Sequence, residues 1–179
     1  MTARRTVFLL LLLASAALRA MAADLLIERA DGVQVHYGVE LALTPATRTR
    51  GLMGRKVLPA RHGMWFDFGA PVAVQMWMKD TPLPLDMAFV DAHGRIVHIA
   101  ADTVPFSLTR LVAPQPVRYV LELAAGSLAA AAVSPGARVV LTPALQAAGH
   151  SPRAATSAAK PPLKPSSDTG TSIASRSAS

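Results

Sequence analysis

The middle of the chain alternates between apolar and polar residues in short runs. From Val33 to Leu43 every second residue is apolar, and Gln34, His36 and Glu40 lie between them. Such a period of two is typical of a strand with one buried face. Further short runs rich in apolar residues occupy 25–29, 64–68, 74–79, 85–90, 95–101, 117–123 and 137–142. We therefore predict about eight short strands.

Capping signals predict two short helices between these strands. Thr44 and Pro45 are suited to the N-cap and first position of a helix that runs to Arg50 or Met53 and is ended by Gly51 or Gly54. The Ala-rich segment 126–133 predicts the second helix, and the proline-containing segment 102–116 predicts a loop. The expected fold class is α+β and mostly antiparallel, with a strongly curved sheet or a partly closed small β-barrel.

The two ends of the chain differ from this pattern. Residues 1–23 combine Arg4 and Arg5, an apolar run over 7–13 and the small-residue site Ala20-Met21-Ala22, which is typical of a secretory signal peptide. We expect cleavage after Ala22 or Ala23, since the apolar run is too short to span a membrane comfortably. A retained membrane anchor is the alternative. We therefore expect an exported protein, periplasmic or secreted, with one β-rich domain over residues 24–146.

Residues 147–179 consist mainly of Ser, Ala, Pro, Lys and Thr, so we expect a disordered tail. The net charge of +7 belongs largely to the two ends, because residues 24–146 hold 11 basic and 10 acidic residues. A nucleic-acid surface on the domain is therefore not expected. We also expect a monomer, and no membrane contact after cleavage. The chain contains no Cys, so disulfide staples are excluded.

The stretch from Met76 to Asp91 is the best candidate for a site. Pro82 and Pro84 stiffen the connection between two strands, and Trp77, Lys79 and Asp86 lie beside it. A Trp next to a Lys can stack a planar or sugar-like ligand and pair with its acidic group. We predict a ligand-binding cleft beside residues 79–86, formed by the four candidate residues Arg50, Trp77, Lys79 and Asp86. The competing interpretation is a packed indole and a structural Lys79–Asp86 ion pair.

Several segments resemble one known family. They are Arg50-Gly-Leu-Met-Gly-Arg55, Gly63-Met-Trp-Phe-Asp-Phe68, Met76-Trp-Met-Lys-Asp-Thr-Pro-Leu-Pro-Leu-Asp86, Phe89-Val-Asp91 with Gly94, and Tyr119-Val-Leu-Glu-Leu-Ala-Ala-Gly126. In order and spacing they are similar to the domain of unknown function 192 family, also called the uncharacterised protein family 0127. The resemblance implies a compact β-rich fold in a small, often exported protein, and no established activity. Many relatives have a longer, often Cys-containing loop where residues 106–115 lie here.

Two other functions remain open beside a module that binds a small molecule or a protein partner. A soft-metal carrier would bind Cu(I) through the thioethers of Met53, Met64, Met76 and Met78. Three of these fall on the apolar faces of strands, where Met ordinarily fills core gaps.

A hydrolase-like enzyme would use Asp86 as its carboxylate. We expect Asp67 and Glu122 on solvated strand faces and Asp91 in a turn. The sequence contains no nucleophile elbow, phosphate loop or zinc signature, and no cofactor is expected.

Overall fold

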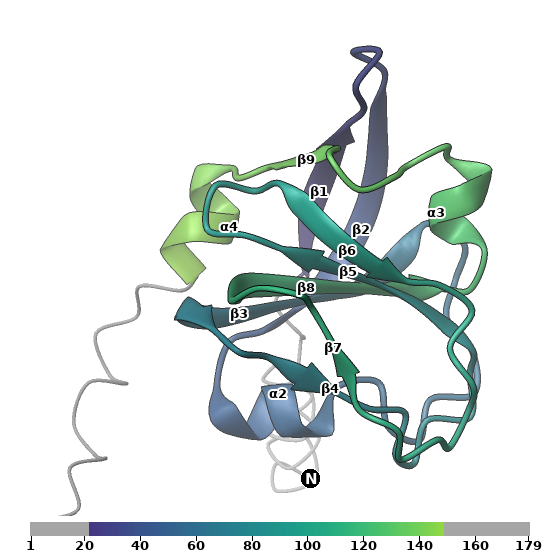
Figure 1. The fold of residues 1–179 in the computed structure, drawn as a ribbon. Helices are drawn as coiled ribbons and strands as arrows, with labels where there is room; N and C mark the ends of the chain where they lie inside the picture. Colours follow the sequence, from purple (N-terminus) through teal and green to yellow (C-terminus); the bar gives the residue numbers. More distant parts are fainter. Residues whose placement is uncertain (1–21, 149–179) are drawn as a thin grey trace, which may run out of the picture.

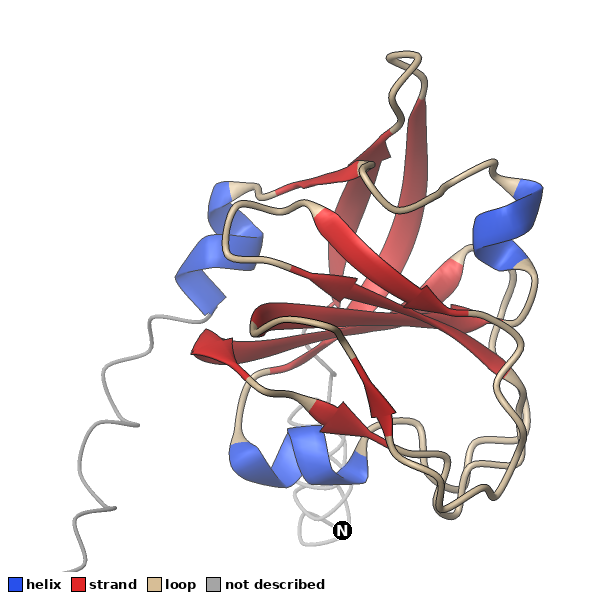
Figure 2. Ribbon diagram, viewed as in Figure 1, coloured by secondary structure: helices blue, strands red, loops and turns tan. Residues whose placement is uncertain are grey.

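The computed structural model describes residues 22–148 and contains one large curled β-sheet with a small second sheet beside it (Figures 1 and 2). The strands are β1 (Ala22–Glu28), β2 (Gln34–Ala42), β3 (His62–Val72), β4 (Gln75–Met76), β5 (Leu85–Val90), β6 (Ile96–Ala100), β7 (Leu111–Val112), β8 (Val117–Ala124) and β9 (Arg138–Val140). The helices are α2 (Pro45–Arg50), α3 (Ser127–Ala130) and α4 (Pro143–Ala148). None of the described helices is long and apolar enough to cross a membrane.

The large sheet has the order β6-β5-β8-β3-β2-β1-β9, and the small sheet pairs β4 with β7. All strand pairs are antiparallel except β2 and β3, which run parallel. The sheet curls into a half-barrel whose two edges approach at one end. There the amide of Ile96 donates to the carbonyl of Ala137 at 2.8 Å, and that of Val139 donates to Gly94 at 2.7 Å. The predicted fold class is confirmed.

Two apolar clusters pack against the two faces of this sheet. The inner cluster fills the half-barrel and includes Leu25, Tyr37, Val39, Trp65, Val90, Tyr119, Leu121 and Leu123. The outer cluster lies on the other face and includes Leu52, Met64, Phe66, Val74, Met78, Leu85, Met87, Phe89 and Val120. Strands β3, β5 and β8 therefore carry buried side chains on both faces, as strands covered on two sides do.

This two-sided burial corrects one expectation. Asp67 and Glu122 do not lie on solvated strand faces, because their exposed fractions are 2% and 4%. Asp67 pairs with Arg118, whose Nε and Nη2 donate to its carboxylate at 3.1 and 3.2 Å. Glu122 faces the outer cluster and lies on β8 between β3 and β5, strands that are distant from it in sequence.

The local predictions at α2 are confirmed. Thr44 is the N-cap, and its side chain accepts from the amide of Thr47 while the Thr47 hydroxyl accepts from the amide of Thr44, a capping box. Pro45 occupies the first helical turn and Gly51 ends the helix. Gly51 has a φ of +47°, and a Cβ there would lie 3.3 Å from the Phe66 ring, so this turn favours glycine.

The segment 102–116 is not wholly a loop, because Leu111 and Val112 form β7 and pair with β4. The second predicted helix is shorter than expected and covers Ser127–Ala130. Most of the expected signal peptide and tail lies outside the described residues. Ala22 and Ala23, the two predicted cleavage positions, belong to β1 and pair with Glu40 and Val39.

Candidate functional site

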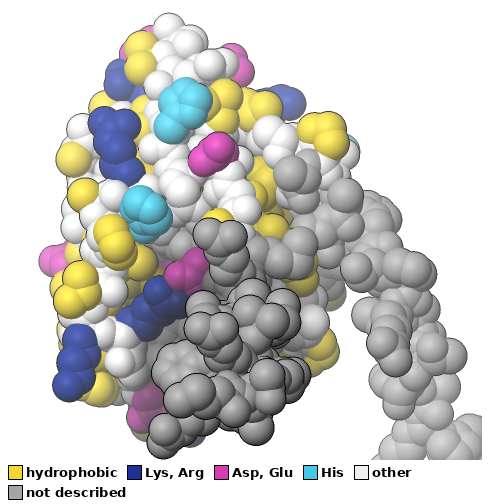
Figure 3. All heavy atoms as spheres, turned by 180° about the vertical axis from the view of Figure 1, so that it is seen from behind, with side chains coloured by type: hydrophobic (Ala, Val, Ile, Leu, Met, Phe, Trp, Pro, Cys, Tyr) yellow, Lys and Arg dark blue, Asp and Glu magenta, His cyan; other side chains and the backbone are white. Residues whose placement is uncertain are grey.

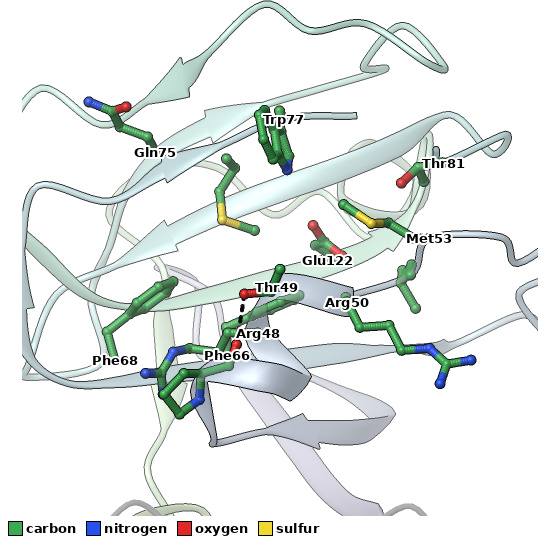
Figure 4. A pocket seen from close by; sticks show the side chains of 14 residues that line it. Arg48, Thr49, Arg50, Met53, Phe66, Phe68, Gln75, Trp77, Thr81 and Glu122 are labelled. Carbon is green, nitrogen blue, oxygen red and sulfur yellow. Dashed lines mark hydrogen bonds between the residues drawn. The ribbon is translucent and has the colours of Figure 1, made fainter. Parts of the chain in front are cut away.

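A cavity of about 350 Å³ lies on the outer face of the sheet, between α2 and the segment 75–81 (Figure 4). Its walls come from four separate segments of the chain. The side chains and main chain that line it belong to Pro45, Arg48, Thr49, Arg50, Gly51, Leu52, Met53, Phe66, Phe68, Gln75, Met76, Trp77, Thr81 and Glu122.

The parallel pairing of β2 and β3 creates one wall of this cavity. Two parallel neighbours cannot be joined by a tight turn, so the chain must cross back over a face of the sheet. Residues 43–61 make this crossing and include α2. Figure 1 shows α2 and β4 on the same side of the large sheet. Leu52, buried at 2% exposure, packs in the outer cluster just after the helix.

The opposite wall is held by main-chain hydrogen bonds around the turn 78–81. The amide of Gly54 donates to the carbonyl of Asp80 at 2.8 Å, which ties this turn to the end of the crossover. The amide of Met78 donates to Ser107 at 3.0 Å, and that of Phe106 donates to Thr81 at 3.1 Å. The turn 78–81, which directly precedes Pro82 and Pro84, is therefore fixed from two sides.

Glu122 forms the floor of the cavity. It lies in the central strand β8, where its neighbours across the ladder are Met64 on β3 and Met87 on β5. Its Oε2 atom is buried and has no hydrogen-bond partner within the described residues. Burial in these apolar surroundings raises the pKa of Glu122 from 4.5 to about 8, because a charged carboxylate is poorly solvated there. The group is thus mainly protonated at neutral pH.

Trp77 forms the roof. Its side chain is 46% exposed, and Figure 4 shows its indole nitrogen directed toward Glu122, with Met53 and Thr81 on one side of the carboxyl group. The Lys79 ammonium lies 5.7 Å from the centre of the Trp77 ring, which is a cation–π distance. The cavity between the exposed indole of Trp77 and the buried carboxyl group of Glu122 is therefore open to a ligand.

Cationic side chains surround the opening. Arg48 donates to the carbonyls of Leu43 and Asp67 at 2.6 and 2.8 Å, and its guanidinium lies over the Phe68 ring. The side chain of Arg50 has no hydrogen-bond or ion-pair partner among residues 22–148, and in Figure 4 it extends along the rim away from Glu122.

The structure brings together some of the predicted residues and separates one. Arg50 and Trp77 line the cavity, and Lys79 lies next to it over the indole ring. The placement of Asp86 beside them is wrong. Asp86 is 1% exposed, and its two oxygens accept from the amides of Asp102 and Leu128, each at 3.0 Å. Asp86 therefore does not line the cavity, forms no ion pair with Lys79, and holds two main-chain amides instead.

Glu122 is the residue that sequence reasoning missed. It was expected on the polar face of a strand. The run Val117–Leu123 is nearly continuous in apolar residues, however, which indicates a strand buried on both faces. A single carboxyl group within such a run is a buried polar group, and that signal was present in the sequence.

The methionines divide between packing and the cavity. Met64 and Met78 are buried at 7% and 1% exposure in the outer cluster, and the Met78 sulfur accepts from the Thr103 hydroxyl at 3.1 Å. Met53 and Met76 line the cavity. Within residues 22–148 no group of three or more His, Cys, Asp or Glu side chains is placed to hold a metal ion.

These features define a small half-barrel domain with one carboxyl-floored cavity on its outer face. The chain belongs to the domain of unknown function 192 family, described as uncharacterized ACR, whose model matches residues 26–141. This agrees with the resemblance found in the sequence motifs.

Two solved structures are similar to this chain. One is a protein from Sinorhizobium meliloti 1021 named as a candidate transcription regulator, which is 41% identical with a TM-score of 0.67 and is matched over 69% of this chain and 95% of that one. The other is a protein of unknown function from Novosphingobium aromaticivorans DSM 12444, 34% identical with a TM-score of 0.64, matched over 66% and 84%. Among curated proteins, none matches the chain.

Proposed function

We propose that this protein is an exported binding module that holds a small molecule in the cavity between Glu122 and Trp77. The observation that carries the proposal is the side chain of Glu122, which lines that cavity and whose buried Oε2 atom has no hydrogen-bond partner within the described residues. A buried polar atom without a partner costs about 1–3 kcal/mol, which a bound ligand that pairs with it recovers. Export rests on the signal-peptide pattern of residues 1–23.

The size of the cavity supports a small molecule over a protein partner. About 350 Å³ lies near the lower end of the range for ligand pockets. The lining also has the composition of a ligand site, since Phe66, Phe68 and Trp77 supply aromatic surface and one carboxyl group supplies a directional contact.

A role in transcription, which the name of the Sinorhizobium protein suggests, finds less support. The part of the chain from 24 to 146 carries 11 basic and 10 acidic residues. On the face seen in Figure 3, Lys and Arg side chains are interspersed with Asp, Glu and His. A DNA-binding surface ordinarily concentrates positive charge on one face.

A second candidate is acid–base catalysis by Glu122, favoured by its pKa of about 8, which lies in the range that general acids use. The two hydroxyl groups at the cavity are occupied by main-chain oxygens, however. Thr49 donates to Pro45 at 2.8 Å and Thr81 to Lys79 at 3.1 Å. Neither is activated by an adjacent base, so binding is the function that the geometry supports best.

The test is a ligand screen with a blocked cavity. Thr49→Phe places a ring in the opening from α2, and Ala46→Phe adds the same ring on the same helix at a residue that does not line the cavity. A metabolite library is screened by ligand-observed NMR against the mature protein and both variants. We expect hits that bind the unmodified protein and Ala46→Phe and are at least about tenfold weaker in Thr49→Phe. The proposal is overturned if the hits bind Thr49→Phe as tightly as the unmodified protein, or if there are no hits.

A further inference from the structure

The cavity has cationic side chains at its rim and hydrogen-bond donors inside. Arg48 and Arg50 line it, Lys79 lies over Trp77, and Arg110 donates to the side-chain oxygen of the lining residue Gln75. None of these four cations forms a salt bridge with a carboxylate within the described residues. The opening is therefore electropositive and favours an anionic group.

The inside presents donors. The carboxyl group of Glu122 is surrounded by apolar side chains, since β3 and β5 place Met64 and Met87 on either side of it. In its protonated form it offers one O–H donor. The indole nitrogen of Trp77 can only donate, and it is directed toward the same space in Figure 4. A ligand that satisfies both groups must bring an acceptor atom.

We propose that the cavity takes a small organic anion that also carries a neutral oxygen acceptor, with its charged group at the cationic rim and its acceptor against Glu122 and Trp77. This rests on the proposed binding function and deepens it by naming the class of ligand. The oxygen is that of a hydroxyl or carbonyl group. The volume of about 350 Å³ limits the body of the ligand to about one ring or a short aliphatic chain.

An organic cation fits less well on the same observations. It would have to pass the cationic rim and would need Glu122 in its ionised form inside an apolar wall. Ionised Glu122 would also offer no O–H donor to the anionic ligand that we propose. Besides Glu122, the charged residues that line the cavity are Arg48 and Arg50, and Lys79 lies above the indole ring. Asp80 lies between Lys79 and the lining residue Thr81 in the sequence, and neither the cations nor an aspartate ordinarily changes charge near neutral pH.

The proposal predicts that binding weakens in alkaline solution. The pKa of about 8 for Glu122 means that the protonated form falls to about one-tenth at pH 9. A ligand that needs the O–H donor should bind about tenfold more weakly at pH 9 than at pH 7. A cationic ligand should show the opposite trend, because ionised Glu122 attracts it.

The experiment uses two matched series of probes. 4-Hydroxyphenylacetate, tyramine and 4-hydroxyphenethyl alcohol share a phenol, and 5-hydroxypentanoate, 5-amino-1-pentanol and 1,5-pentanediol share an aliphatic hydroxyl. Dissociation constants are measured by NMR titration of the mature protein at pH 7. We expect the carboxylate in at least one series to bind about tenfold more tightly than its amine and its alcohol.

Three variants sharpen the result. Arg50→Ala should remove most of the preference for the carboxylate, and Arg138→Ala, an exposed cation on β9 away from the cavity, should not. With 5-hydroxypentanoate, whose charge is constant between pH 7 and 9, Glu122→Gln should abolish the difference between these two pH values. Gln cannot ionise, so a purely structural role of Glu122 would not predict this change.

Each outcome decides one question. Tighter binding of the amines, or binding that strengthens toward pH 9, overturns the class of ligand and leaves the binding function intact. Failure of all six probes also overturns the class proposed here. The library screen with Thr49→Phe separately decides whether the cavity binds any small molecule.

Discussion

Two buried carboxyl groups lie on the adjacent strands β5 and β8 and differ in what surrounds them. Asp86 faces the side of the sheet that carries the inner cluster, and both of its oxygens accept main-chain amides at 3.0 Å. Glu122 faces the outer cluster, and its Oε2 accepts nothing within the described residues. Burial alone therefore does not distinguish these two carboxyl groups. They differ in hydrogen bonding and in position, because Glu122 lines the cavity, whereas Trp65 Nε1, which also has no partner within the described residues, lies in the inner cluster.

The strongest way to break this comparison is to remove the satisfied carboxylate. Asp86→Ala leaves the amides of Asp102 and Leu128 without their acceptor, and we expect a loss of about 3–5 kcal/mol in the free energy of unfolding. Urea denaturation measures it. Asp86→Asn keeps one acceptor oxygen and should cost less. A loss below about 1 kcal/mol for the alanine variant would mean that Asp86 is not the structural anchor described above.

The unsatisfied carboxyl group should make stability fall with pH. The pKa of Glu122 is about 8 when folded and near 4.5 when unfolded, so the folded state binds more protons between these values. Stability is then fully present below pH 4.5, falls by up to about 1.4 kcal/mol per pH unit as the pH rises, and levels off above pH 8.

Unfolding free energies measured from pH 5 to 9 in the unmodified protein and in Glu122→Gln test this slope. The difference between the two proteins should change by about 2–4 kcal/mol across that range, in favour of the variant at high pH. Parallel curves for both proteins would show that Glu122 does not titrate as described.

Two arginines of the same short helix allow a comparison between a side chain with hydrogen-bond partners and a side chain without them. Arg48→Ala removes two hydrogen bonds to main-chain carbonyls, and we expect a loss of about 1–2 kcal/mol. Arg50→Ala removes no side-chain hydrogen bond or ion pair among residues 22–148, and the change should stay within about 0.5 kcal/mol. Thermal unfolding of both variants provides the comparison. Equal losses would place Arg50 in the framework of the fold and remove it from the site.

A small effect on stability is also expected at the roof of the cavity. Trp77 is 46% exposed, so Trp77→Ala should lower stability by less than about 1 kcal/mol. The same variant should weaken every cavity ligand by at least about tenfold, because the indole contributes both surface and its N–H donor. Calorimetric titration with the strongest ligand from the screen measures this. A large loss of stability without a loss of affinity would identify Trp77 as a packing residue.

Part of this structure was predictable because its causes are local. The alternation over Val33–Leu43 predicted β2, and Thr44, Pro45 and Gly51 predicted the bounds of α2 within its capping box. The curvature of the sheet followed from many short strands with turns between them. These features depend on residues that are neighbours in sequence.

The site depended on contacts between distant segments. Asp86 and Glu122 both occupy positions that a one-sided strand would expose, and only the covering of the outer face by α2, β4 and β7 buries Glu122. The strand β7 has two residues, which is too short for a period to show. The placement of Trp77 and Glu122 on opposite sides of one cavity likewise cannot be predicted from a short segment of sequence.

The parallel pair β2–β3 has a consequence for how this domain can vary. The crossover between them is anchored by the capping box of α2 at one end and by the Gly54–Asp80 hydrogen bond at the other. The strand pairing of the large sheet does not involve the residues between these two points. Residues inserted or removed between these two anchor points would resize the chamber while the strand register stays the same. The size of the cavity can therefore change through one connection without a change in the strand framework.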